Sequence, residues 1–120
     1  MHTVIETAPY LSAAEEAGLS EAERFDIITM LAAEPSSGEL IRGTGGCRKV
    51  RVAGRGKGKS GGYRVVTFYS GVNVPLFLLT VFSKGQRANL NRAEQNALAK
   101  LTNILVESLS KPTKSRGDRN

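Results

Sequence analysis

The chain has 120 residues, 40% of them hydrophobic and 23% charged, which suits one globular domain and excludes a disordered or fibrous chain. A single cysteine and a single histidine exclude an internal disulfide framework and a Cys/His zinc site, and no apolar run reaches the roughly 20 residues of a membrane span. The net charge is +6, but residues 40–92 carry eleven bases and no acid, whereas residues 1–39 carry eight acids and one base. We therefore expect a cytoplasmic protein without metal or other cofactor that binds a polyanion; an acidic substrate or a membrane surface is the alternative partner.

The acidic N-terminal third is predicted to form one strand and two helices. Residues 3–7 have the composition of a short strand, and residues 11–17 that of a short helix. Ser20–Glu23 is a capping box, in which each side chain accepts a hydrogen bond from an exposed backbone N–H of the other residue. It opens a second helix that ends before Pro35. The apolar side of this helix is predicted from the spacing of Phe25, Ile28, Leu31 and Ala32.

The middle of the chain changes to the two-residue period of β-structure. Residues 48–53 alternate, with Lys49 and Arg51 on one face and two valines on the other. Residues 63–69 and 76–82 are rich in β-branched and aromatic residues and are predicted to form a hairpin.

A second capping box, Asn91–Glu94, opens the last predicted helix. Its apolar side consists of Ala97, Leu98, Leu101, Ile104, Leu105 and Leu109. The order β-α-α-β-β-β-α predicts an α+β domain over residues 1–110, with helices packed on one face of a small, mostly antiparallel sheet. Residues 111–120 contain no apolar residue, and we expect a basic, disordered tail.

The Gly/Lys/Arg segment 53–62 matches a relaxed phosphate-loop pattern, yet it precedes a predicted strand instead of the helix that such a loop must open. We interpret it as the cationic tip of a hairpin, because Arg55, Lys57 and Lys59 alternate with glycines and can contact successive phosphates. Lys84 and Arg87, after the next strand, would join the same rim. The alternative is a solvated loop whose charges only keep the protein soluble.

Such a cluster suits cleavage of RNA by its own 2′-hydroxyl, which requires a base, cations on the phosphorane and an acid at the leaving oxygen. Histidines usually supply the proton transfers, but a lysine crowded by other cations has a lowered pKa and can replace them. The candidates are Lys57, Lys59 and Lys84, with Arg64 as the phosphate clamp. The aromatic residues of the hairpin could stack on bases, or form the core and cross-strand pairs instead: Tyr63, Phe68, Tyr69 and Phe82.

Three segments together resemble the RelE/ParE toxin superfamily, most closely its HigB-type branch: GTGGCRKVR (Gly43–Arg51), GKGKSGGYRVV (Gly56–Val66) and LLTVFSK (Leu78–Lys84). The resemblance implies the α+β fold derived above and a ribosome-dependent endoribonuclease that cleaves translated mRNA. It further implies a cognate antitoxin of helix-turn-helix type and contact with operator DNA only through the antitoxin complex. A membrane is not among the implied partners.

Carried over by position, the resemblance places Lys57, Lys59, Arg64 and Lys84 at the cleavage site. The residues expected to bind RNA are Arg48, Lys49, Arg51, Arg55, Phe82 and Arg87. Many relatives have tyrosine where Phe82 stands, and without that hydroxyl only stacking on a base is expected there. This difference favours the alternative function, a non-catalytic or weakly catalytic binding module such as a ParE-like gyrase inhibitor or an operon co-repressor.

Overall fold

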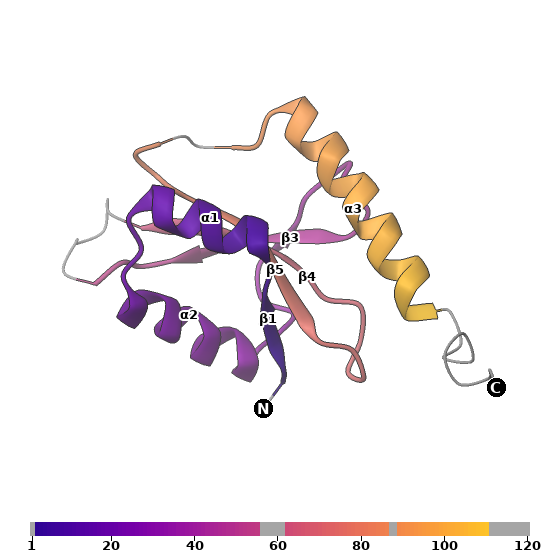
Figure 1. Cartoon of the computed structure of the whole chain (residues 1–120), viewed down its shortest axis with the longest axis horizontal. Coiled ribbons are helices and arrows are strands. Elements are labelled where there is room, and N and C mark those ends of the chain that lie inside the picture. The colour runs from indigo at the N-terminus through magenta and orange to yellow at the C-terminus, as the bar shows by residue number, and fades with distance from the viewer. Residues whose placement is uncertain (1, 56–61, 87–88, 111–120) are drawn as a thin grey trace.

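A computed structural model describes residues 2–55, 62–86 and 89–110 of the chain. Its centre is a sheet in the order β1-β5-β4-β3-β2, in which β1 pairs with β5 in parallel and the other neighbours are antiparallel (Figure 1). The strands are β1 (Val4–Glu6), β2 (Glu39–Leu40), β3 (Cys47–Val52), β4 (Tyr63–Phe68) and β5 (Leu76–Ser83). The predicted hairpin is thus confirmed as β4 and β5, with an irregular register between Val66 and Thr67.

Two helices follow β1 and cover one face of the sheet. Helix α1 (Ala8–Ala17) is capped by Thr7, and α2 (Glu21–Ala33) begins with the predicted reciprocal capping box of Ser20 and Glu23. Their buried side chains join one face of β3, β4 and β5 in a first hydrophobic cluster. Its fully buried members include Tyr10, Ile27, Leu31, Val65 and Leu78.

Helix α3 (Arg92–Ser110) covers the opposite face of the sheet. Successive residues of a strand point to opposite faces, and Val65 belongs to the first cluster, whereas Val66 belongs to a second cluster with Leu98 of α3. Figure 1 shows α3 set apart from α1 and α2. The α+β class is therefore confirmed, but packing of all the helices on one face is wrong, because the apolar side of α3 matches the other face.

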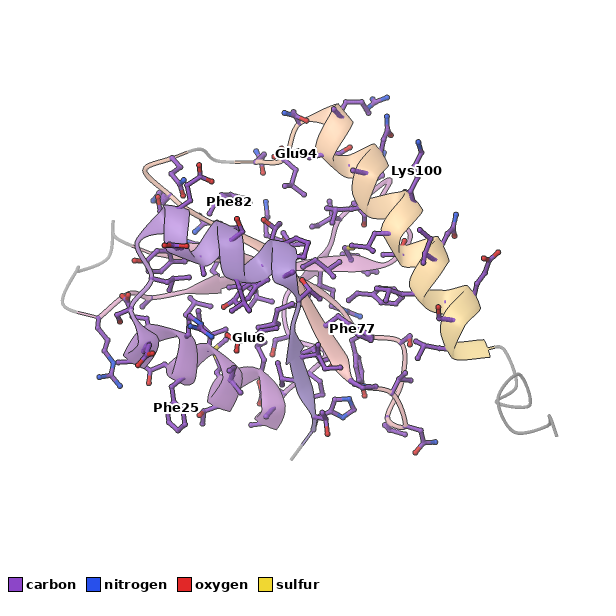
Figure 2. The ribbon with its side chains drawn as sticks, in the orientation of Figure 1. Glu6, Phe25, Phe77, Phe82, Glu94 and Lys100 are labelled. Atoms are coloured by element: carbon purple, nitrogen blue, oxygen red, sulfur yellow. The ribbon has the colours of Figure 1, made fainter. Side chains whose placement is uncertain are left out.

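Three details differ from the sequence-based expectations. Helix α1 begins earlier than expected because Pro9 lies in its first turn, where the missing N–H costs nothing. The two-residue strand β2 was not predicted. On α2, Leu31 and Ala32 are buried as predicted, but Phe25 points away from the domain and is 67% exposed, and Ile27 is the buried residue of that side (Figure 2). The predicted tail, residues 111–120, lies outside the described residues.

Candidate nucleic-acid interface

Three cations share the face of the sheet on which α3 packs, in the part of that face that α3 leaves open. The register places Arg51 of β3 directly opposite Arg64 of β4, and Lys49 lies two residues before Arg51 on the same side. Directly opposite side chains have Cβ atoms about 4.5–5.5 Å apart, where like charges destabilise a sheet. We call Lys49, Arg51 and Arg64, with Lys84 at their end, the cationic face. This arrangement favours an anionic ligand, because an anion would relieve the repulsion.

Two adjoining hollows make the cationic face concave. The first, of about 300 Å³, is lined by Arg51, Arg64 and Lys84 together with residues 52, 53 and 62. The second, of about 430 Å³, is lined by Lys49, Arg51 and Arg64 together with residues 38, 39 and 50. Arg51 and Arg64 line both hollows. A nucleic-acid strand could therefore run from one hollow to the other with its phosphates along the two guanidinium groups.

Lys84 is held at the first hollow by the end of the β4–β5 ladder. Its backbone N–H donates to the Gly62 carbonyl at 3.0 Å, which extends the pairing one step beyond β5. The turn that follows is closed by the Gln86 side chain, whose Oε1 accepts from the Ser83 N–H at 2.7 Å. The structure thus brings together the predicted site residues Arg64, Lys84, Arg51 and Lys49.

Of the other predicted residues, three lie outside the described part of the chain and one lies on the other face of the sheet. Lys57, Lys59 and Arg87 lie outside the described residues, so their role stays a prediction. Arg48 alternates with Lys49 and therefore lies on the other face of the sheet, opposite Thr67, where its guanidinium donates to the Gly38 carbonyl at 3.2 Å. Arg48 does not join the cationic face.

Arg55 is paired with an acid of α2 and does not extend freely toward a ligand. Its guanidinium donates two hydrogen bonds to the Asp26 carboxylate, at 2.6 and 2.9 Å, and its backbone N–H donates to Glu23 at 3.0 Å. The Arg55 guanidinium lowers the pKa of the Asp26 carboxyl. The pair therefore persists at neutral pH and is lost only as the pH falls through that lowered pKa.

Asp26→Asn is expected to increase affinity for single-stranded RNA about two- to threefold at neutral pH, because it frees the Arg55 guanidinium and removes a nearby negative charge. Fluorescence anisotropy with a labelled oligonucleotide measures the change. Glu16→Gln, an equal change of charge on the exposed side of α1, is the control. An equal gain in both variants would show that only net charge matters and that Arg55 does not contribute.

The prediction that Phe82 binds RNA by stacking is wrong for this conformation. Phe82 lies opposite Arg64 on β5, but its ring is only 1% exposed and packs in the second cluster with Leu90 and Leu98. Tyr63 and Phe68 are buried as well. Leu90, just before α3, packs in the second cluster with Phe68 and Phe82, whereas Tyr63 lies in the first cluster on the other face. These three aromatic residues therefore form core, as the alternative interpretation held.

Glu39 is a site residue that sequence reasoning missed. It pairs with Lys49 across β2 and β3 and lines the larger hollow beside Arg51. Gly38 allows this close approach, because it has φ +96° and a Cβ there would lie 2.6 Å from the Lys49 carbonyl oxygen. A two-residue strand has no readable periodicity, and only its pairing with β3 could have shown that this acid borders the basic block.

The remaining reactive groups of the described chain lie apart from this face. Among the described residues no group of three or more His, Cys, Asp or Glu side chains could hold a metal ion. Cys47 is fully buried, and burial raises the pKa of its thiol to about 11, so it is not a thiolate at neutral pH. None of the helices in the described ranges is long and apolar enough to cross a membrane.

Comparisons with known proteins agree with this architecture. Residues 7–115 match the family described as the RelE toxin of the RelE/RelB toxin-antitoxin system. The free-state structure of a double mutant of the E. coli toxin RelE superposes with a TM-score of 0.54. That match has 17% sequence identity and covers 84% of this chain and 96% of the other, so it shows a shared fold.

Proposed function

Because the chain belongs to the RelE toxin family, we propose that it is the toxin of a toxin-antitoxin system and that it cleaves translated mRNA in a ribosome-dependent reaction. The observation that carries the proposal is the juxtaposition of Arg51, Arg64 and Lys84 around one hollow. These groups supply the cations that phosphodiester cleavage requires, on a face whose repulsion an RNA phosphate would relieve.

The proposed reaction is attack of a ribose 2′-oxygen on the adjacent phosphorus. The bond from phosphorus to the 5′-oxygen breaks, and the products are a cyclic phosphate and a free 5′-hydroxyl. Arg51 and Arg64 would bind the non-bridging oxygens and stabilise the added charge of the phosphorane, since guanidinium groups match phosphate in geometry. Lys84, at the same hollow, is the candidate acid for the leaving oxygen, and the nearby Glu39 carboxylate is a proton acceptor for the 2′-hydroxyl. The predicted catalytic roles of Lys57 and Lys59 are retained in the proposal.

The finer assignments belong to the same proposal. The three sequence segments that resemble the HigB-type branch support that branch and a helix-turn-helix antitoxin. The cytoplasm is the expected compartment, because translated mRNA is found there. Residues 1–110 would form the toxin domain, and residues 111–120 a basic tail outside it.

Cleavage assayed on ribosomes tests the proposal directly. Purified protein should cut an mRNA that is bound in the A site of a translating ribosome and leave the same RNA intact when it is free. Primer extension locates the cut, and phosphatase or ligase treatment identifies the cyclic phosphate and the 5′-hydroxyl. Intact ribosome-bound mRNA at toxin excess would refute the cleavage activity.

One observation favours a second candidate, a binding module that inhibits gyrase or acts as co-repressor. Among the described residues that line the two hollows of the cationic face there is no imidazole or phenol, the groups that most often transfer protons in RNA cleavage. Induction in growing cells separates the two functions. An early stop of protein synthesis supports the nuclease, whereas an early DNA-damage response supports gyrase inhibition.

A further inference from the structure

A third cationic hollow, separate from the two on the cationic face, lies on the flank of α3. It has a volume of about 290 Å³ and is lined by Arg42, Gly43, Arg92, Gln95 and Asn96. The two arginines are fifty positions apart in the chain, and both are exposed. No carboxylate is among the described residues that line this hollow. We call it the two-arginine pocket.

One wall of the two-arginine pocket is a turn that packs tightly on α3. The turn 43–46 lies against α3, where the Thr102 hydroxyl donates to the Thr44 carbonyl at 2.9 Å. Gly45 has φ +78°, and a Cβ there would overlap the Thr102 hydroxyl, so the turn backbone packs directly on the helix. Arg42 is therefore carried by a turn with a fixed position relative to Arg92.

The position of Arg92 favours a bound anion in addition to the Glu94 carboxylate of the same turn. Arg92 is the first residue of α3, where the partial positive charge of the helix end repels a cation. The capping box of Asn91 and Glu94 uses backbone N–H groups of this turn, with both hydrogen bonds at 2.8 Å. An anion between the two guanidinium groups would offset both the mutual repulsion and the repulsion from the helix end.

The two-arginine pocket continues the cationic face. Lys49 of that face donates to the Asn89 side chain at 2.8 Å, and Asn89 lies three residues before Arg92. The N–H of Ile41 donates to the Cys47 carbonyl at 2.8 Å, which places Arg42 beside the start of β3. From there to Arg51 the strand extends about 13 Å, at about 3.3 Å per residue. One strand of nucleic acid could thus contact both regions.

We propose that Arg42 and Arg92 form a second phosphate site, which holds a backbone phosphate of the same RNA strand whose scissile phosphate lies on the cationic face. The inference rests on the proposed function for the identity of the strand as RNA. It assigns the pocket a role in binding and positioning the strand, not in bond cleavage. A longer RNA should therefore gain affinity that a shorter one cannot.

Binding of uncleavable DNA oligonucleotides tests this site separately from cleavage. The probes are a fluorescent oligothymidylate trinucleotide and a dodecanucleotide, which lack the 2′-hydroxyl nucleophile. The dodecanucleotide should bind the intact chain roughly tenfold more tightly than the Arg42→Ala/Arg92→Ala variant, while the trinucleotide binds both equally. The slope of log affinity against log salt for the dodecanucleotide should fall in magnitude by about 1.4, from two lost phosphate contacts.

The matched control is Arg48→Ala/Lys100→Ala, which also removes two charges. Lys100 points away from the body of the domain on α3, and Arg48 lies on the other face of the sheet (Figure 2). Equal losses in the two double variants would overturn the inference, as would an unchanged dodecanucleotide affinity. In each of those cases, cleavage of ribosome-bound mRNA by the intact chain would still stand as the separate test of the proposed function.

Discussion

Arg64→Ala is expected to abolish growth arrest and to slow cleavage of ribosome-bound mRNA about 10²–10³-fold, the usual cost of removing one charge-stabilising group. Arg64 lines both hollows of the cationic face together with Arg51, so its loss leaves one guanidinium group where two are proposed to bind the phosphorane. The fold should remain intact, because the substitution removes the repulsion with Arg51. The free energy of unfolding is expected to stay equal or to rise by a few tenths of a kcal/mol.

The control for Arg64→Ala is Arg48→Ala, which removes the same kind of charge from a neighbouring strand. Arg48 lies on the opposite face of the sheet, and its substitution should leave both growth arrest and cleavage unchanged. Growth after induction, primer extension on ribosomes and thermal unfolding give the three readouts. If the Arg64 variant arrested growth as fully as the parent chain, the cationic face would not be the site of cleavage.

Two substitutions of Phe82 should have very different outcomes, because its ring is core. Phe82→Leu keeps most of the apolar volume and is expected to cost about 1.5 kcal/mol or less of stability, with cleavage retained. Phe82→Ala leaves a cavity beneath the start of α3 and is expected to cost about 3–5 kcal/mol, a large part of the stability of a small domain. Activity should then be lost through unfolding.

Denaturant unfolding and the ribosome assay, done on both Phe82 variants, separate packing from stacking. A ring that stacks on a base would make the leucine variant stable but inactive. That result would mean that the segment before α3 moves aside when RNA binds, and it would restore Phe82 to the set of RNA-binding residues.

The elements of the fold could be predicted because their signals are local. The capping boxes at Ser20 and Asn91 set the starts of α2 and α3, and the alternation of Lys49 and Arg51 set the phase of β3. The face that α3 covers could not be predicted, because an apolar helix side does not show which side of a sheet it meets. That choice depends on the long-range packing of Leu98 against Val66.

The sequence predicted that the candidate site would be cationic, but it did not predict which residues form it. The charge block identified Arg51, Arg64 and Lys84, and strand register brought them together. The same block also contains two residues that do not join the site. Arg48 lies on the other face of the sheet because side chains alternate along β3, and Arg55 is hydrogen-bonded to Asp26 of α2. Glu39 lies outside the block in sequence and inside the site in space. Which residues leave or join the site therefore depends on strand pairing and on contacts between distant elements. A single sequence does not show these contacts.

Repulsion between the opposed guanidinium groups of Arg51 and Arg64 lowers the free energy of unfolding of the unbound protein. Any anion that binds the folded chain and not the unfolded chain shifts the folding equilibrium toward the native state by mass action. RNA would do so, and so would a protein partner that presents carboxylates to the same strands. The melting temperature would then report whether the face is occupied, and the unbound chain would be the form most exposed to proteolysis.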